Sequence, residues 1–478
     1  MNTARSGFST EKTIAIIGGG VSGALTAYHL VAEGVQARVV VIDPGAELGL
    51  GLAYSTASLR HLLNVPAGKI SALPQEPGHF FEWLRANYDA EATEAMFAPR
   101  AVFGRYVQGL VSDVRGLEQI RKTVINYTPS GAGAALTLND GSELLADLIV
   151  LATGNFDPAD LPGISKQAKA TGAYCHNAWL PSTYEGLAPD ASVTLIGTGL
   201  TGVDVLLRLR ELGHRGVVTA VSRHGVFPNR HADYTPLLRT AIPAGTTATC
   251  LAYLRAVRSA IAYGAEWRAA IDSLRASTND LWLALPLAEQ KRFRRHLQRR
   301  WEVVRHRMAP PIADAVQAEL KGGTLVLREG HLAEVKATSC GAQVMLRTSR
   351  GCEELLSNRV INCTGPSMDY RRVRSPLLQS LFAQGVATTG PLGSGFNCSR
   401  SGAMIGADGR ASRVLFNLGP GRLGTLLESI AIPEIREQAA EIAAMLVRHV
   451  EASSESTTGT AAAPTLARLT SAMERPTA

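Results

Sequence analysis

The chain has 478 residues, about three times the ~150 residues of a typical domain, which excludes a single small module. Hydrophobic residues make up 46% and charged residues 19% of the chain, a balance that excludes a disordered or fibrous protein. The formal net charge of +7 is compatible with an anionic partner. Its interpretation depends on whether the excess positive charge is spread along the chain or concentrated in one segment.

The six cysteines and the N-terminal residues bear on the compartment. No cysteine pair has the C-x-x-C spacing, and none lies beside histidines at zinc-site spacing. This argues against a disulfide framework, a redox dithiol and a bound metal. The N-terminus lacks the features of a signal peptide, and no apolar run reaches the ~18 residues of a membrane span. We therefore expect a cytoplasmic protein that does not contact a membrane.

A βαβ unit opens the chain. Apolar residues 13–17 predict a strand that leads into Gly-Gly-Gly-Val-Ser-Gly at 18–23 and then into a helical pattern. A second apolar strand ends at Asp43, which is placed to accept hydrogen bonds from an adenosine ribose. In this fingerprint the first glycine permits a tight turn, the second admits a pyrophosphate, and the third allows close helix packing. Those glycines are Gly18, Gly20 and Gly23.

The same order of elements returns near the middle of the chain. An apolar strand leads into Gly-Thr-Gly-Leu-Thr-Gly at 197–202, then into a helix and another strand. No acid follows this strand, and Arg223 and His224 stand in its place. A guanidinium suits the 2′-phosphate of NADPH, so the sequence favours NADPH over NADH. The alternative is that Arg223 is an ordinary solvated arginine at a strand end.

Each unit is followed by a strand that ends in Thr-Gly, at 153–154 and at 364–365, which indicates a divergent internal duplication. Two adenine dinucleotide sites most simply mean one held redox cofactor, FAD at the first site, and one exchanging hydride donor, NADPH at the second. The predicted fold class is α/β, with two Rossmann-like dinucleotide-binding domains and a helical insertion. We expect a glutathione-reductase-like FAD domain at 1–165 and 350–450, an NADPH domain at 166–349, an insertion at about 236–320, and a disordered tail at 451–478.

Further motifs resemble a known family. They include GLAYST at 51–56, HLLNVPAGKISALP at 61–74, SRHGVFP at 222–228 and NCTGP at 362–366. With the opening fingerprint, they resemble the FAD/NAD(P)-binding proteins of the YdhS-like type, which are related to class B flavin monooxygenases. The resemblance implies that NADPH reduces FAD and that reduced FAD and O2 form a C4a-hydroperoxyflavin. That species would hydroxylate a nitrogen or sulfur of a small molecule, with an amine or amino acid as one candidate substrate.

Candidate residues around the flavin have alternative interpretations. Asn64 is a candidate to hydrogen-bond flavin or peroxide, or else a turn former. Arg100 is a candidate to hold an anionic group, or else an ion-pair partner. Gly419 precedes a helix start expected at Thr425, whose N-terminus would face the flavin or simply carry a capping box. The candidate catalytic residues are Asn64 and Arg100. The candidate cofactor-binding residues are Gly18, Gly20, Ser22, Gly23, Asp43, Asn64, Val124, Thr153, Gly154, Gly197, Gly199, Leu200, Thr201, Gly202, Arg223, His224, Thr364, Gly365, Gly419 and Thr425.

Residues 291–308 hold eight Lys or Arg and one Glu, so this segment alone carries a charge equal to that of the whole chain. Apolar residues from Phe293 to Met308 recur at helical spacing, which predicts one amphipathic helix with its arginines outside. Because its aromatic residues face inward, we do not expect nucleic-acid binding.

Two alternatives to a monooxygenase stay open: an NADPH:acceptor oxidoreductase and a flavin-binding sensor. The oligomeric state is also open, and a homo-oligomer is one alternative.

Overall fold

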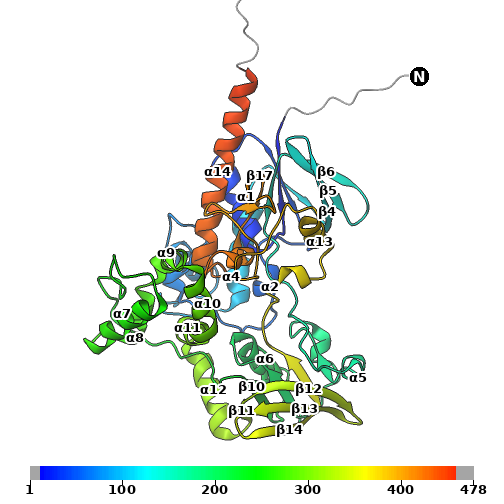
Figure 1. The fold of residues 1–478 in the computed structure, drawn as a ribbon, viewed down its shortest axis with the longest axis vertical. Coiled ribbons are helices and arrows are strands. Elements are labelled where there is room, and N and C mark those ends of the chain that lie inside the picture. Colours follow the sequence, from blue (N-terminus) through cyan, green and yellow to red (C-terminus); the bar gives the residue numbers. More distant parts are fainter. Residues whose placement is uncertain (1–10, 459–478) are drawn as a thin grey trace, which may run out of the picture.

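The computed structural model describes residues 11–458, which form two α/β units and a helical insertion (Figure 1). The first unit contains a six-stranded sheet in the order β16-β17-β7-β1-β2-β3, parallel except for β16. Every residue of β1 is buried, as expected for a parallel strand covered on both faces. The strands of this sheet are β1 (Thr13–Ile17), β2 (Arg38–Ile42), β3 (Leu117–Ile120), β7 (Leu148–Leu151), β16 (Ala403–Ile405) and β17 (Ala411–Asn417).

Different layers cover the two faces of this sheet. Helices pack on one face through residues such as Leu25, Phe103 and Leu446. The three-stranded sheet β4-β5-β6 and helix α13 pack on the other face. These elements are β4 (Val124–Ser130), β5 (Gly133–Leu138), β6 (Glu143–Ala146), α1 (Val21–Ala32), α2 (Gly51–Tyr54), α3 (His79–Asn87), α4 (Arg100–Ser112), α13 (Pro376–Ala383) and α14 (Ile432–Thr458).

The second unit repeats this layering. Its five-stranded parallel sheet has the order β11-β10-β9-β15-β8, with α6 and α12 on one face and the sheet β12-β13-β14 with α5 on the other. The repeat confirms the predicted fold class of two Rossmann-like units. Its elements are α5 (Lys166–Ala170), β8 (Tyr174–Cys175), β9 (Val193–Ile196), α6 (Leu200–Glu211), β10 (Val218–Ser222), α12 (Pro310–Gly322), β11 (Leu325–Glu329), β12 (His331–Thr338), β13 (Gly341–Thr348), β14 (Gly351–Ser357) and β15 (Arg359–Asn362).

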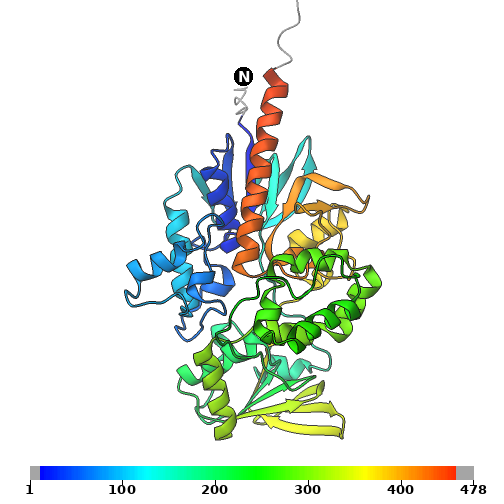
Figure 2. The same ribbon diagram turned by 90° about the vertical axis from the view of Figure 1, so that its left-hand side faces the viewer.

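The helical insertion lies in the sequence between β10 and α12, and in space it also contacts the first unit. Figure 2 shows it (green) beside the start of α14. Arg305 is buried, and its Nη2 lies 2.7 Å from Oε2 of Glu428 in the first unit. The predicted insertion is therefore present, and an ion pair fastens it to the other unit. Its helices are α7 (Cys250–Ala262), α8 (Trp267–Asp272), α9 (Thr278–Ala284), α10 (Leu287–His296) and α11 (Gln298–Arg305).

Two expectations about the second unit and its insertion are wrong. The boundary at 349/350 is misplaced, because β14 pairs with β13 and β15 pairs with β9 in the second unit. Residues 291–308 do not form one helix. The backbone breaks at Leu297, where φ is −116°, and separates α10 from α11.

Two expectations about the C-terminal region also need correction. No helix starts at Thr425, because a 3-10 helix spans Gly419–Gly424 and α14 begins only at Ile432. Residues 451–458 continue α14 instead of forming a disordered tail, and residues 459–478 lie outside the described range. Within residues 11–458, no helix combines the length and hydropathy needed to cross a bilayer.

Candidate functional site

The first glycine-rich turn is tightly packed. Gly18 has φ +106°, and a Cβ there would lie 2.3 Å from the carbonyl oxygen of Ala152. A Cβ at Gly23 would lie 1.9 Å from the carbonyl oxygen of Gly18. Real Cβ contacts are not this short, so both positions require glycine. The predicted roles of a tight turn and close helix packing are present in the geometry.

Helix α1 begins at this turn with free donors. Its N-cap is Gly20, and no side chain of residues 11–458 caps the helix, so the N–H groups of its first turn are available to a ligand. Gly419 is brought to the same place, since a Cβ there would lie 2.7 Å from Ser22 Oγ. Thr425 has a different role, because its Oγ1 accepts from the backbone N–H of Cys398 at 3.1 Å.

The Asp43 carboxylate, after β2, is held by backbone donors. Its Oδ2 accepts from the N–H of Gly19 at 2.6 Å and its Oδ1 from the N–H of Gly45 at 2.7 Å. A carboxylate oxygen has more than one lone pair, so each can still accept from a ribose hydroxyl. Asp43 therefore fixes the turn and remains suited to its predicted contact.

A segment that the sequence analysis did not assign to the turn covers it. The N–H of Gly49 donates to the carbonyl of Gly19 at 2.7 Å, and a Cβ at Gly20 would lie 3.4 Å from Cα of Gly51. Both covering glycines have positive φ, +93° and +54°. The sequence feature that could have predicted this cover is Gly-Leu-Gly at 49–51, because two glycines there permit backbone-to-backbone approach.

The remaining first-unit candidates lie at strand ends. Val124 is buried at the start of β4 and packs in the core between the two sheets. Thr153 and Gly154 follow β7 after Ala152, and Gly154 has φ +67° with open space where a Cβ would lie. Val124 therefore has a packing role, while Thr153 and Gly154 lie beside the glycine-rich turn through Ala152.

The second glycine-rich turn has the same internal packing. A Cβ at Gly197 would lie 2.4 Å from the carbonyl oxygen of Cys363, and one at Gly202 would lie 2.5 Å from that of Gly197. Helix α6 starts at Leu200 with Gly199 as its N-cap and no side-chain cap. A Cβ at Gly199 would meet nothing within 4 Å, so this turn lacks the cover seen in the first unit.

A cleft of about 440 Å³ lies over this second turn. Arg223 and His224 line it, are exposed, and make no hydrogen bond or ion pair within residues 11–458. Thr201, Thr364 and Gly365 line the same cleft. The structure thus brings together the predicted second-unit residues around an open space, with two side chains free to meet an anion.

Arg299 of the insertion also lines this cleft and was missed by sequence reasoning. Its Nη2 donates to the carbonyl of Val226 at 2.8 Å and to Thr198 Oγ1 at 3.1 Å. In the sequence Arg299 is one of the arginines of the basic segment 291–308, and nothing in its spacing links it to the turn. Tertiary packing places α11 over the turn. Arg299 therefore stabilises the loop after β10.

The two candidate catalytic residues lie where the units meet. Arg100 Nη1 lies 2.8 Å from Asp204 Oδ2 on α6, and both side chains are largely buried. Its Nε donates to the carbonyl of Leu62 at 3.1 Å. The Asn64 carbonyl accepts from His231 Nε2 at 3.0 Å. Arg100 thus has a carboxylate partner from the other unit, and the Asn64 backbone is a second bridge.

His231 is a neutral bridge. Burial, with a smaller contribution from nearby Arg307, lowers the pKa of His231 to about 4. Its ring also lies 5.0 Å from that of Phe97. A neutral imidazole donates to the Asn64 carbonyl through Nε2, so the contact does not depend on protonation at neutral pH.

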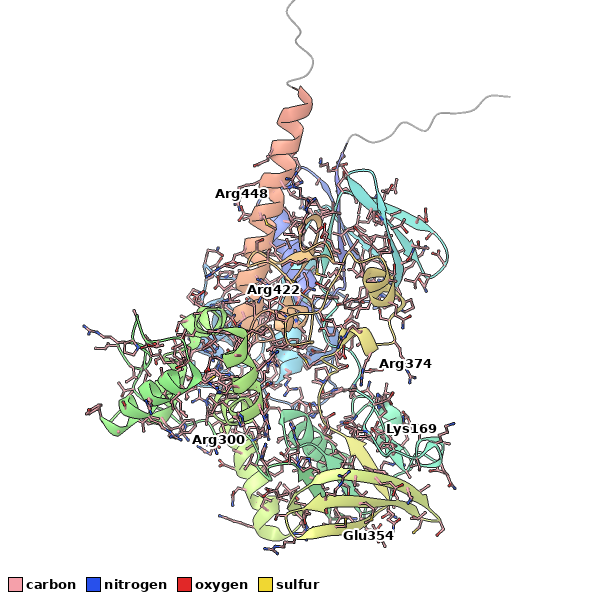
Figure 3. All side chains as sticks on the ribbon, in the orientation of Figure 1. Lys169, Arg300, Glu354, Arg374, Arg422 and Arg448 are labelled. Atoms are coloured by element: carbon pink, nitrogen blue, oxygen red, sulfur yellow. The ribbon has the colours of Figure 1, made fainter. Side chains whose placement is uncertain are left out.

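Buried polar atoms without partners lie between the units. Asn362 Nδ2, at the end of β15, and His176 Nδ1, after β8, are buried and lack a hydrogen-bond partner among the described residues. Asn362 lines a narrow cavity of about 190 Å³ together with Arg100 and Thr201. His176 lines a neighbouring cavity with Lys169 and Arg374, which Figure 3 labels. Unpaired buried polar groups are costly, so this gap is suited to a polar ligand.

Comparison with known proteins agrees with this geometry. Residues 15–156 match a family model described as FAD-NAD(P)-binding. These residues form a domain of that family. The match covers the first glycine-rich turn, its acid and the Thr-Gly strand end, so the predicted FAD/NAD(P)-binding character is confirmed.

Relatives by sequence cover part of the chain. The protein YdhS of Escherichia coli (strain K12) is 25% identical over 256 residues, which are 48% of this chain and 46% of YdhS. A Baeyer-Villiger monooxygenase of Streptomyces coelicolor is 26% identical over 206 residues, 41% of this chain and 32% of that protein. The matches thus span less than half the length of either relative. The predicted resemblance to YdhS-like proteins and flavin monooxygenases is confirmed.

Solved structures share the fold of two α/β units. Kutzneria sp. 744 ornithine N-hydroxylase superimposes with a TM-score of 0.64 at 13% identity, over 92% of this chain and 99% of that one. The reduced form of an ornithine hydroxylase from Pseudomonas aeruginosa gives 0.62 at 16% identity, over 92% and 100%. A flavin-containing monooxygenase from Stenotrophomonas maltophilia gives 0.53 at 18%, over 93% and 99%. The fold of two α/β units is therefore shared with these structures.

Proposed function

We propose that the protein is an FAD-dependent, NADPH-consuming monooxygenase that oxygenates a nitrogen or sulfur of a small molecule. The observation that carries the proposal is the difference in cover between the two turns. The Gly49–Gly51 segment closes over the first turn, which suits a cofactor that stays bound. The open cleft over the second turn suits a hydride donor that enters and leaves once per turnover.

The hydrogen-bonding groups at the first turn fit FAD. The uncapped start of α1 supplies N–H groups for a pyrophosphate, and Asp43 supplies carboxylate oxygens for a ribose. Gly419, beside Ser22, adds backbone at the same place. FAD bound there would accept a hydride and activate O2, while the residues around it exclude water and fix its position.

The second turn fits NADPH. Arg223 and His224 have no partner among the described residues, and they stand at the position where an NAD site has an acid. A Cβ at Gly199 or at Gly365 would meet nothing within 4 Å, so a ligand can approach the backbone closely at both positions. In the proposed overall reaction, NADPH and a proton are consumed with O2, one oxygen atom enters the substrate and the other leaves as water.

Asn64 and Arg100 have separate proposed roles. The Asn64 side chain makes no hydrogen bond among the described residues, so its amide is available to the flavin or to oxygen. Arg100 is committed to Asp204, so we assign it the role of a positioning residue that sets how α4 and α6 meet. The cytoplasmic location and a homo-oligomer stay predictions.

Rapid mixing of the NADPH-reduced protein with O2 tests the proposal. We expect a transient absorbance that differs from those of the oxidised and the fully reduced flavin. Immediate return of the oxidised spectrum would contradict oxygenation and favour an NADPH:acceptor oxidoreductase on the same scaffold. Failure of NADPH to bleach the bound flavin would contradict both and favour a flavin-binding sensor.

A further inference from the structure

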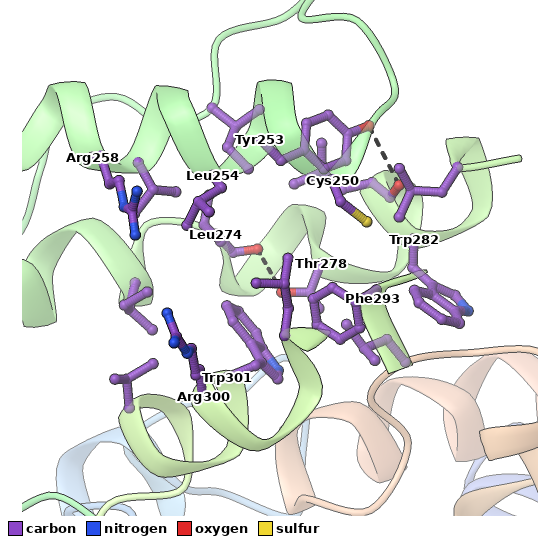
Figure 4. Close-up of a pocket in the computed structure, with 18 of the residues that line it drawn as sticks. Cys250, Tyr253, Leu254, Arg258, Leu274, Thr278, Trp282, Phe293, Arg300 and Trp301 are labelled. Carbon is purple, nitrogen blue, oxygen red and sulfur yellow. Dashed lines mark hydrogen bonds between the residues drawn. The ribbon is translucent and has the colours of Figure 1, made fainter. Parts of the chain in front are cut away.

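The helical insertion contains an apolar cavity of about 280 Å³, separate from both glycine-rich turns (Figure 4). Helices α7, α8, α9, α10 and α11 form its walls, together with Leu427 of the first unit. Its volume is close to the lower end, about 300 Å³, of typical small-molecule pockets. The aliphatic side chains Leu254, Val257 and Leu274 are among those that face it.

The polar atoms in the cavity wall already have partners. The Thr278 hydroxyl donates to the carbonyl of Leu274 at 2.8 Å. The indole N–H of Trp282 donates to the carbonyl of Thr425 at 3.0 Å, and that of Trp301 to Glu428 Oε1 at 3.2 Å. A ligand inside the cavity is therefore offered apolar contact and no unsatisfied hydrogen-bonding group of these side chains.

Two arginines that line the cavity have no partner in the described part of the chain. Arg258 on α7 and Arg300 on α11 are exposed and make no hydrogen bond or ion pair within residues 11–458. Figure 4 shows both on one side of the cavity, across from Trp282 and Phe293. Five other arginines of the insertion are ion-paired within the protein, namely Arg268, Arg292, Arg299, Arg305 and Arg307. Arg255 and Arg295 are also exposed without a partner among the described residues, but they do not line the cavity.

We propose that this cavity binds the acyl chain of a medium-chain carboxylate, with the carboxylate held between Arg258 and Arg300. The apolar walls bury the chain, and the guanidinium groups at one side meet the head at the exposed rim. No acidic residue is among those that line the cavity, so a free amine head would meet only like charge. This assignment is independent of the proposed oxygenation and stands even if that reaction is wrong.

Titration of the oxidised full-length protein with decanoate tests the site. Trp282 and Trp301 line the cavity, so saturable quenching of tryptophan fluorescence should report binding, with calorimetry as a second readout. Each methylene added along a series from hexanoate should tighten binding by about threefold to fourfold until the cavity is full. Decanol, which lacks the charge, should bind about tenfold more weakly.

Matched variants separate the head site from the chain site. The double variant Arg258→Ala with Arg300→Ala should bind decanoate about tenfold more weakly and decanol unchanged. Arg255→Ala is the control, because Arg255 is an exposed α7 residue that does not line the cavity. Val257→Trp should fill the cavity and abolish binding of both ligands.

Several results would overturn the assignment. These are quenching that does not saturate, equal affinity of the double variant and the unchanged protein for decanoate, or no gain in affinity with chain length. NADPH bleaching of the flavin, measured on the same samples, reports separately on the proposed function. A protein that binds decanoate without being reduced by NADPH would support the cavity assignment and contradict only the oxidoreductase.

Discussion

In both units the first glycine of the turn packs against a carbonyl from the strand that ends in Thr-Gly. A Cβ at Gly18 would lie 2.3 Å from the Ala152 oxygen, and one at Gly197 would lie 2.4 Å from the Cys363 oxygen. The second glycine differs. Gly20 is covered by Gly51, whereas Gly199 faces open space. The strand-turn-helix geometry thus fixes the shared part of each site, and the chain segments outside it decide how open the site is.

The third glycine of each turn allows the sharpest test of this comparison. Gly23→Ala places a methyl group 1.9 Å from the Gly18 carbonyl, so the turn must move. We expect complete loss of bound flavin and a fall in the free energy of unfolding of about 1–3 kcal/mol. Gly202→Ala places its methyl group 2.5 Å from the carbonyl oxygen of Gly197 in the second turn. This variant should keep the flavin and raise the KM for NADPH. Flavin absorbance after gel filtration and NADPH bleaching kinetics measure both.

Gly109→Ala serves as the control for these variants. Gly109 lies within α4, and a Cβ there meets nothing within 4 Å. Alanine is the better helix former by about 1 kcal/mol, so this variant should keep its flavin and gain slightly in stability. If Gly202→Ala loses flavin while Gly23→Ala retains it, the assignment of FAD to the first turn is wrong.

Arg223→Ala tests the open site alone. Removing a charge-assisted contact with a 2′-phosphate should raise the KM for NADPH about tenfold or more, because such bonds contribute about 1.5–3 kcal/mol. The KM for NADH, which lacks that phosphate, should stay unchanged, as should the amount of bound flavin. Steady-state bleaching rates with both nucleotides measure the change. Equal losses for NADPH and NADH would make Arg223 a general structural residue.

The sequence predicted the features that follow from local spacing. The glycines of both turns, Asp43 and the basic side chain after β10 all lie where their positions relative to a strand end require. The misplaced domain boundary was recoverable by the same logic. The strand ending at 153–154 belongs to the first sheet, so its counterpart ending at 364–365 belongs to the second.

Features that depend on tertiary packing were not predictable. The apolar spacing of Phe293, Leu297 and Trp301 continues through the break at Leu297. The spacing shows which residues are buried, but it does not show that the helix axis changes direction there. In the structure Phe293 packs toward α7 and Trp301 toward α8, in two separate clusters. The ion pair of Arg100 with Asp204 joins residues 104 positions apart, which no spacing rule connects.

The hydrogen bond of His231 to the Asn64 carbonyl gives the prediction with the smallest expected effect, and it concerns how the two units are joined. Burial lowers the pKa of His231 from 6.5 to about 4, so between these values the folded state binds fewer protons than the unfolded state. The free energy of unfolding therefore rises with pH in this range, and the stabilisation is lost as pH falls from 6.5 toward 4.

His231→Gln keeps an N–H donor for the Asn64 carbonyl and removes the titration. Between pH 7 and pH 5.5 the unchanged protein should lose about 1 kcal/mol more stability than the variant, since one pKa unit corresponds to about 1.4 kcal/mol and partial exposure screens part of it. Urea unfolding at both pH values gives this difference, and other histidines cancel between the two proteins. Parallel losses would mean that the pKa of His231 is the same in the folded and unfolded states, so that burial does not hold its imidazole neutral in the contact with Asn64.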